Sequence, residues 1–265
     1  MEVAEPEVLQ GGVANAGAVT REGAYVLRPS NLQSELIHAL LRHVRDAGFN
    51  GVPEPVGIDP DGRERLVFVP GDVAWPPFPA WSQTDKALAS IAELLARFHA
   101  AARGFEIPTG VTWNRELADP AGETKICHND VCVENVVFRD GVAVALLDFD
   151  FAAPGRPLYD LAVMARMCVP LDTPDDAAVW GRGGLDPFHR LRIVADSYGL
   201  PPGREELVEI IEQGMGRGGE FVRHRVERGE PAFIEMWERM GGEARYDRRR
   251  DWFARHRDRF VDALG

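Results

Sequence analysis

Three polar side chains near the middle of the chain have the types and the spacing to bind a cation and to accept a proton. Asn135 follows Asp130 by five residues, and Asp148 comes after the next apolar run. One amide oxygen and one carboxylate, with positions left for water and phosphate oxygens, form a ligand set that suits Mg²⁺. We therefore expect Asn135 and Asp148 to hold Mg²⁺ with a nucleotide. Asp130 would accept the proton of a hydroxyl group aimed at the terminal phosphate.

A tight turn between two apolar strands is expected to bring these side chains together. Asp140-Gly141 favours a two-residue type I′ turn, and apolar runs flank it on both sides. The register set by such a turn places Asn135 opposite Leu146. Asn135 then shares a sheet face with Asp148, diagonally across at roughly 7 Å.

The spacing also matches the pattern H-x-D-x-x-x-x-N followed by an aspartate, which is typical of kinases. We expect His128 to support the loop rather than to react. Asp150 either contacts a second metal ion or hydrogen-bonds to loop amides. Taken singly, His128, Asn135 and Asp148 also have structural readings, as a core histidine, a turn residue and a strand-end acid. Their joint spacing and register favour a catalytic site.

The elements that must position these residues divide near residue 70, where a Pro-rich and Gly-rich stretch, 70–79, interrupts regular structure. We predict an N-terminal nucleotide-binding lobe at 1–70 and a C-terminal catalytic and substrate-binding helical lobe at 71–265. Strands are expected at 7–9, 18–21, 25–28, 53–58 and 65–69, with a helix at 32–46 that Asn31 caps. Later helices are predicted at 83–99, 158–167, 187–198, 205–226, 233–240 and 248–264. The Gly-rich segment 214–219 is predicted to interrupt a helix rather than to bind a dinucleotide.

Composition and charge exclude several classes of function. A net charge of −12 argues against binding to nucleic acid or to an anionic membrane surface, and it favours cationic ligands. No stretch approaches the ~20 apolar residues of a membrane helix, and the acidic start lacks a secretory signal, so we expect a cytoplasmic protein. The only lysines, Lys86 and Lys125, do not complete a P-loop. Three cysteines without a CxxC pair indicate neither a disulfide framework nor a common zinc site.

The central motifs resemble those of the aminoglycoside phosphotransferase and choline-kinase-like superfamily. The resemblance is carried by His128-Asn-Asp130, by Asn135, and by the run from Leu147-Asp-Phe-Asp150 through Gly155 to Asp160-Leu-Ala. It is nearest to the bacterial phosphotransferases of that superfamily, some of which are labelled as immunity proteins against the peptide toxin trifolitoxin. The usual H-G-D reads H-N-D here.

This resemblance implies a fold and a set of roles. The fold would be α/β (α+β), a two-lobed protein-kinase-like fold with a small antiparallel-sheet N-lobe and a larger helical C-lobe. Asp130 would be the catalytic base, Asn135 and Asp148 would hold Mg²⁺, and Asp160 would fix the catalytic loop from the following helix.

The N-terminal part resembles the same superfamily more loosely. Arg28 takes the place of the strand lysine that contacts nucleotide phosphates, with Glu35 on the next helix as its expected partner. Gly11 and Gly12 resemble the flexible loop over the phosphates. Val67 to Val69 resembles the hinge that hydrogen-bonds the adenine edge.

The resulting expectation is a kinase that moves the γ-phosphoryl group of ATP or GTP to a hydroxyl of a small molecule. A cationic acceptor such as an aminoglycoside-like antibiotic is favoured, faced by acids after Asp160, namely Asp172, Asp175, Asp176 and Glu238. Two alternatives stay open. One is a metabolic kinase for choline, a sugar or an amino-alcohol, and the other is a non-catalytic nucleotide-binding immunity protein.

Overall fold

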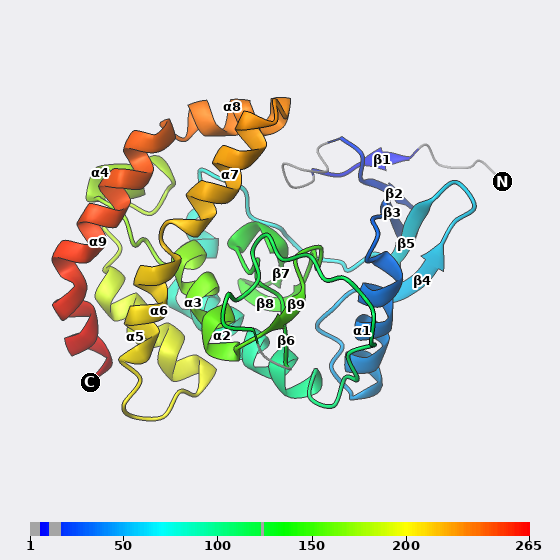
Figure 1. The fold of residues 1–265 in the computed structure, drawn as a ribbon, viewed down its shortest axis with the longest axis horizontal. Coiled ribbons are helices and arrows are strands. Elements are labelled where there is room, and N and C mark those ends of the chain that lie inside the picture. The colour runs from blue at the N-terminus through cyan, green and yellow to red at the C-terminus, as the bar shows by residue number, and fades with distance from the viewer. Residues whose placement is uncertain (1–5, 11–16, 123–124) are drawn as a thin grey trace.

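The computed structural model describes residues 6–10, 17–122 and 125–265. In Figure 1 an antiparallel sheet with one helix lies on the right, most of the helices lie on the left, and a hairpin lies between them. One apolar core joins the helix beside the sheet to the last helix of the chain. Gly11 and Gly12, predicted to form a loop over phosphates, lie outside the described residues.

The N-terminal sheet has five strands in the order β1-β2-β3-β5-β4, and each neighbouring pair is antiparallel. The strands are β1 (Glu7–Val8), β2 (Thr20–Glu22), β3 (Tyr25–Pro29), β4 (Pro55–Ile58) and β5 (Arg63–Val67). Helix α1 (Ser34–Asp46) connects β3 to β4. Because α1 separates them in the chain, the pairing of β3 with β5 is a long-range contact that no local pattern specifies.

The start of α1 differs from its prediction. Leu32 precedes the helix and is fully exposed, whereas the buried stripe consists of Ile37, Leu40, Leu41 and Val44. Asn31 does not cap the helix. Its side chain accepts a hydrogen bond from the Gln33 amide at 2.8 Å instead, so it forms a turn one step before the helix.

The segment after β5 forms backbone hydrogen bonds with the hairpin that follows residue 135. Asp72 and Phe138 exchange two backbone hydrogen bonds, each 2.8 Å long. Gly71 has φ 149°, and a Cβ atom there would lie 2.5 Å from the Phe138 carbonyl oxygen. Only glycine permits this close approach. The division of the chain into lobes at residue 70 stays a prediction.

The later chain forms most of the helices that the sequence predicts. They are α2 (Asp85–Ala101), α3 (Pro157–Cys168), α4 (Pro174–Val179), α5 (Pro187–Tyr198), α6 (Glu206–Gly214), α7 (Arg217–Glu227), α8 (Pro231–Arg239) and α9 (Gly242–Leu264), with short 3-10 turns η2 (Ala80–Gln83) and η3 (Val133–Asn135). The predicted interruption at 214–219 is confirmed, because the expected helix 205–226 divides there into α6 and α7. Helix α4 was not predicted, and α9 begins before the expected Arg248. Within the described residues, no helix is both long and apolar enough to cross a membrane.

The central hairpin confirms the turn but corrects the register. Strands β7 (Val136–Arg139) and β8 (Val142–Leu146) are joined through Asp140 and Gly141, both with the positive φ of a type I′ turn. A β-bulge then shifts the pairing by one residue. Leu146 therefore pairs with Val136, and the prediction that it faces Asn135 is wrong. The Asn135 carbonyl instead accepts a hydrogen bond from the Leu147 amide at 2.8 Å.

Candidate active site

The loop between β6 (Lys125–Cys127) and β7 carries Asp130. The Asp160 carboxylate binds the backbone of that loop. Asp160 lies in the first turn of α3 and is fully buried. Its two carboxylate oxygens accept hydrogen bonds from the backbone amides of His128 at 2.6 Å and Asn129 at 2.8 Å. A carboxylate that satisfies two consecutive backbone donors fixes the direction in which the next residue leaves the loop.

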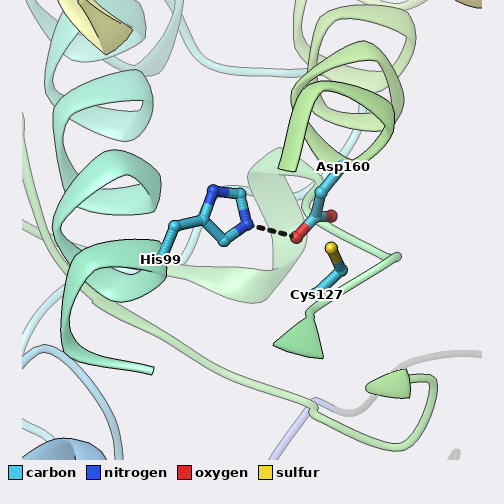
Figure 2. A group of neighbouring side chains, drawn as sticks. All are labelled: His99, Cys127 and Asp160. Carbon is cyan, nitrogen blue, oxygen red and sulfur yellow. Dashed lines mark hydrogen bonds and ion pairs between the residues drawn. The ribbon is translucent and has the colours of Figure 1, made fainter. Parts of the chain in front are cut away.

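A third group, His99 of α2, also binds Asp160. Figure 2 shows its Nε2 atom directed at the carboxylate, at 2.9 Å, with Cys127 beside the pair. Burial opposes ionisation of Asp160, but the hydrogen bond from His99 and the loop amides outweigh it and lower the pKa of Asp160.

The ligand atoms of His99, Cys127 and Asp160 lie within 4.8 Å of one another. Burial and the Asp160 charge raise the pKa of the Cys127 thiol, so it stays protonated, and we interpret the group as structural rather than as a metal site.

The departure from H-G-D to H-N-D has a backbone explanation. Asn129 has φ 64°, a left-handed conformation that glycine adopts freely and asparagine tolerates better than most residues. Its side-chain amide donates to the Phe151 carbonyl at 3.0 Å. Asparagine therefore keeps the turn and adds a bond between the loop and the chain after Asp150.

This conformation gives a testable contrast between two substitutions. We expect Asn129→Gly to be more stable than Asn129→Ala by about 1 kcal/mol, because both lose the side-chain amide and only alanine resists a positive φ. Urea unfolding of the two variants measures the difference. An alanine variant as stable as the glycine variant would show that the loop does not need this conformation.

His128 supports the loop rather than facing the cavity. Its Nδ1 atom accepts the Asp130 amide at 3.3 Å and its Nε2 atom lies 2.8 Å from the Leu147 carbonyl oxygen. One nitrogen must accept and the other must donate, so the neutral ring with the proton on Nε2 fits both contacts. Burial lowers the pKa of His128, which favours the same neutral form. The ring also packs against Phe149.

Asp130 and Asn135 are in direct contact at the wall of a cavity of about 860 Å³. The Asn135 amide nitrogen donates to the Asp130 carbonyl at 3.0 Å and to its carboxylate at 3.1 Å. This orientation leaves the Asn135 amide oxygen available to a cation. Burial, followed by the charges of Asp148 and Glu134, raises the pKa of Asp130 well above its usual range.

Asp148 also lines this cavity and is paired with Arg28 from β3. Arg28 contacts one oxygen of Asp148 at 3.2 Å through Nη1 and contacts Asp150 through Nη2. Although burial disfavours the charge on Arg28, the carboxylates of Asp148, Asp150 and Glu64 outweigh it and raise the pKa of the guanidinium. Arg28 thus lies where three carboxylates meet.

The expected partner of Arg28 is corrected by this arrangement. Glu35 is exposed on α1, whereas Glu64 pairs with Arg28 across the β3–β5 ladder, with 3.7 Å between Nε and Oε2. Glu64 is buried, and His38 of α1 lies 3.9 Å from the same oxygen. The sequence held no local signal for Glu64, because its position opposite Arg28 depends on the long-range strand pairing.

Asp150 links the N-terminal segment to the site. Its carboxylate contacts Arg28 and also accepts a hydrogen bond from the Asn31 side chain at 3.2 Å. Burial and the neighbouring Asp148 charge raise the pKa of Asp150 to about 6, against the opposing effect of Arg28. The two alternatives predicted for Asp150 were a second metal ion and loop amides, and neither included these contacts with the Arg28 and Asn31 side chains.

Mg²⁺ fits the side chains present here. Asn135 offers an amide oxygen, Asp148 has a second carboxylate oxygen beyond the one that binds Arg28, and both residues line the same cavity. These are hard oxygen donors, few enough to leave positions for water and phosphate oxygens. Burial is the main cause of the raised pKa of Asp130, and the charges of Asp148 and Glu134 add a contribution that a nearby cation would reduce.

The predicted hinge residues lie away from the cavity. Val67 donates its backbone amide to the Glu54 carbonyl at 2.9 Å, and Phe68 donates to the Ala24 carbonyl at 2.8 Å. Neither Val67 nor Val69 is among the described residues that line the cavity. Their role as a hinge stays a prediction.

Of the four acids predicted to face a cationic acceptor, two form ion pairs with arginines and two are exposed away from the described cavity wall. Asp172 lines the cavity but forms an ion pair with Arg245, and Asp176 forms one with Arg248 at 2.7 Å. Asp175 and Glu238 are exposed and are not among the described residues of the cavity wall. The far walls of the cavity instead carry several arginines.

Comparison with known sequences gives two matches. A family model described as the phosphotransferase enzyme family matches residues 111–194. The trifolitoxin immunity protein of Rhizobium leguminosarum bv. trifolii is 33% identical over 187 residues, which cover 69% of this chain and 70% of that protein.

Comparison with solved structures shows the fold. A choline/ethanolamine kinase family protein from Mesorhizobium loti matches with a TM-score of 0.65 and 17% identity, over 99% of this chain and 93% of that one. The GDP complex of aminoglycoside 2′-phosphotransferase-IIIa matches with a TM-score of 0.62 and 14% identity, over 95% and 94%. The predicted α+β, protein-kinase-like fold is confirmed.

Proposed function

Because this chain belongs to the phosphotransferase enzyme family, we propose that it transfers the γ-phosphoryl group of ATP or GTP to a hydroxyl group of a small molecule. One observation carries the proposal. Asp160 fixes the loop that holds Asp130 against Asn135, and both residues share a cavity wall with Asp148. This is the arrangement that a proton acceptor beside a metal-nucleotide site requires.

The proposed reaction balances with Asp130 as the proton acceptor. The acceptor hydroxyl oxygen forms a bond to the γ-phosphorus, and the bond from that phosphorus to the β–γ bridging oxygen breaks. The nucleoside diphosphate leaves with the electron pair, and the hydroxyl proton passes to the Asp130 carboxylate. Because the transition state of phosphoryl transfer is loose, Asp130 contributes mainly by orienting the hydroxyl.

The negative charge of the nucleotide phosphates would be neutralised by Arg28 and by an ion held by Asn135 and Asp148. Asn135 and Asp148 would hold Mg²⁺, which when bound offsets the negative charge of the phosphate oxygens. Arg28 would bind phosphate oxygens in place of a lysine if its two terminal nitrogens exchanged Asp148 and Asp150 for the phosphate, and its planar guanidinium could then form two hydrogen bonds. Glu64, across the β-ladder, would keep Arg28 in position.

The name of a relative supports an antibiotic or toxin as the acceptor, whereas the side chains of this cavity do not support a cationic one. The 33% identical relative is named an immunity protein, which supports a role in resistance to an antibiotic or toxin. A cationic antibiotic acceptor, favoured by the net charge, stays a prediction, as does the cytoplasmic location that would supply ATP and GTP. A metabolic kinase for choline, a sugar or an amino-alcohol remains the alternative enzyme.

Transfer of labelled phosphate tests the function directly. Purified protein would be incubated with Mg²⁺ and γ-labelled ATP or GTP, with aminoglycosides, peptide antibiotics, sugars and amino-alcohols as acceptors. We expect one acceptor class to become labelled, and the label to disappear with Asp130→Asn. If nucleotide bound but no acceptor became labelled beyond the Asp130→Asn background, a non-catalytic nucleotide-binding protein would be the better description.

Binding of nucleotide gives a second test that needs no acceptor. At a hundredfold excess over its Kd, a non-hydrolysable ATP analogue with Mg²⁺ should stabilise the protein by about 2.7 kcal/mol, or roughly 5–10 °C in Tm. We expect Asp148→Asn to lose the Mg²⁺-dependent part of this shift, whereas Asp140→Asn, the same change at the exposed hairpin turn, should keep it. Thermal melts with and without EDTA measure both. A shift that is identical in Asp148→Asn would contradict the metal assignment.

A further inference from the structure

The part of the cavity beyond Asp130 is positively charged. From Tyr159 to Arg249, its wall holds only two acidic residues among those described, Asp172 and Glu235. The same stretch of wall contributes six arginines, Arg166, Arg182, Arg217, Arg239, Arg245 and Arg249. This excess contrasts with the net charge of −12 for the whole chain. The local charge, not the total, determines which ligand enters a cavity.

Some of these arginines already have partners. Arg245 is paired with Asp172, and Arg182 donates to the Gln83 side chain at 3.2 Å and to the Met167 carbonyl at 2.8 Å. Arg249 donates to backbone carbonyls, and its Nε lies 4.0 Å from the Asp172 carboxylate, which Arg245 already occupies. The protein itself therefore provides partners for the side chains of Arg182, Arg245 and Arg249.

Arg166, Arg217 and Arg239 have no acidic partner within the described residues. Arg239 is exposed, whereas Arg217 is partly buried and Arg166 is buried. Within the described residues, the side chain of Arg217 on α7 makes no hydrogen bond or ion pair, and it lines the cavity. Arg166 on α3 donates one hydrogen bond, from Nη1 to the Gly214 carbonyl at 2.7 Å, and has no acidic partner in this part of the chain.

The environment of Arg166 is unfavourable for a cation. The side chain is more than nine-tenths buried, with 8% exposed, and its Nε atom is buried without any hydrogen-bond partner. Burial lowers the pKa of Arg166 to about 10. The charges of Arg249 and Arg217 act in the same direction, and Tyr159 and Asp130 oppose them. The Nε atom faces Gly214, where a Cβ would lie 2.9 Å from it, so within the described residues Nη2 is the Arg166 nitrogen left to bind a ligand. A buried guanidinium with cationic neighbours is stabilised by a bound anion.

The remaining walls are apolar and aromatic. Phe221 and Val222 of α7 and Phe233 and Met236 of α8 line the cavity, and Phe221 packs edge-on against Phe233 with ring centroids 5.8 Å apart. Such walls suit an apolar body, and methionine adapts to irregular shapes. In Figure 1, α7 and α8 lie above the β7–β8 hairpin. Their apolar side chains line the same cavity as Asp130 and Asn135.

We propose that the phosphoryl acceptor is a hydroxyl compound with a carboxylate on an apolar body, and that Arg166 and Arg217 bind the carboxylate. This inference rests on the proposed function and names its substrate class. It replaces the cationic acceptor expected from total charge, because two of the acids that were to bind an amine, Asp172 and Asp176, are paired with arginines, and the other two are not on the described cavity wall. A bidentate contact from either guanidinium would also set the distance between the carboxylate and the reacting hydroxyl.

Binding of three matched probes tests the inference without requiring turnover. The probes are 3-phenylpropionate, 3-phenylpropan-1-ol and 3-phenylpropan-1-amine, titrated by NMR into the full chain with Mg²⁺ and a non-hydrolysable ATP analogue. We expect the carboxylate to bind at least tenfold more tightly than the alcohol, and the amine more weakly than either. Arg217→Gln and Arg166→Gln should each weaken carboxylate binding about tenfold and leave the alcohol unchanged.

The control is Arg223→Gln, the same change on the same helix, at a residue paired with Glu243 and not on the described cavity wall. It should leave all three affinities unchanged. Tightest binding by the amine, equal binding of all probes, or absence of binding would overturn the inference. So would a loss confined to the ATP analogue in Arg217→Gln, because the arginines would then serve the nucleotide phosphates.

Turnover separates this inference from the proposed function. Labelled phosphate transfer would be compared for 3-(4-hydroxyphenyl)propionate and tyramine, which differ in carboxylate against amine. Preference for the carboxylate supports both proposals, and preference for the amine refutes the acceptor class while keeping the kinase. Carboxylate binding with no transfer to any acceptor, here or in the wider panel, refutes the kinase and keeps the carboxylate site.

Discussion

Asp130→Asn is expected to lower the rate of phosphoryl transfer by about 10²–10⁴-fold while leaving nucleotide binding nearly unchanged. The amide has the size of the carboxylate but cannot accept the hydroxyl proton. The contact with Asn135 can be kept through the remaining carbonyl oxygen. Steady-state kinetics on the acceptor found in the transfer panel measures kcat, and a nucleotide titration measures binding.

The same variant should be at least as stable as the wild type, which separates loss of chemistry from loss of fold. The pKa of Asp130 is raised in the folded state, so ionised Asp130 opposes folding. This penalty is absent below the unfolded-state pKa of about 3.9, grows as the pH rises above it, and becomes constant above the raised folded pKa. The stability gain of Asp130→Asn should therefore appear between acidic and neutral pH. Stability that falls in Asp130→Asn at neutral pH would show that the carboxylate has a structural role.

Asp160→Ala is expected to destabilise the protein by about 2–6 kcal/mol, because the buried amides of His128 and Asn129 each lose their acceptor at about 1–3 kcal/mol. It also removes the contact with His99. Because the loop would then no longer fix Asp130, kcat should fall by about 10²-fold or more. Urea unfolding and kinetics measure the two effects.

Conservative and surface substitutions show whether this loss is specific. Asp160→Asn should fall between wild type and Asp160→Ala, since one carbonyl oxygen remains. Asp176→Asn, which breaks the ion pair with Arg248, should cost less than about 1 kcal/mol. A cost for Asp160→Ala no larger than for Asp176→Asn would contradict the assigned role.

The stabilising effect of Asp160 should also depend on pH in the opposite sense to that of Asp130. Its pKa is lowered in the folded state, so its contribution is present above the unfolded-state pKa near 4 and is lost as the pH falls through the lower folded pKa. The difference in stability between wild type and Asp160→Asn should therefore shrink in strong acid.

The features that the sequence predicts correctly depend on residues that are neighbours in the chain. The Asp140-Gly141 turn needs two residues with positive φ, and this dipeptide provides them wherever it occurs between strands. The spacing from Asp130 to Asn135 is short enough that one loop must contain both. The interruption between α6 and α7 falls at Met215 and Gly216, inside a Gly-rich run, and each glycine weakens a helix even though Gly218 and Gly219 are helical in α7.

Tertiary structure decided the rest. The bulge in the hairpin moved Asn135 out of its predicted register, because strand pairing beyond the turn responds to packing as well as to the turn itself. Glu64 rather than Glu35 meets Arg28, because β5 returns beside β3 only after α1 has been placed. The Asn129 backbone, by contrast, shows why an unusual residue in the motif still forms the same turn.

The charge of the acceptor cavity shows most clearly what the sequence determines and what only the fold determines. The sequence by itself determines the residue types, the total charge of −12 and the order of the helices. It does not determine which charges neutralise each other, because ion pairs such as Asp172 with Arg245 join residues far apart in the chain. Electrostatic interactions depend on distance in space and on burial, and both are set only when α3, α7 and α9 pack together. The fold thus places unpaired arginines in the cavity of an acidic protein.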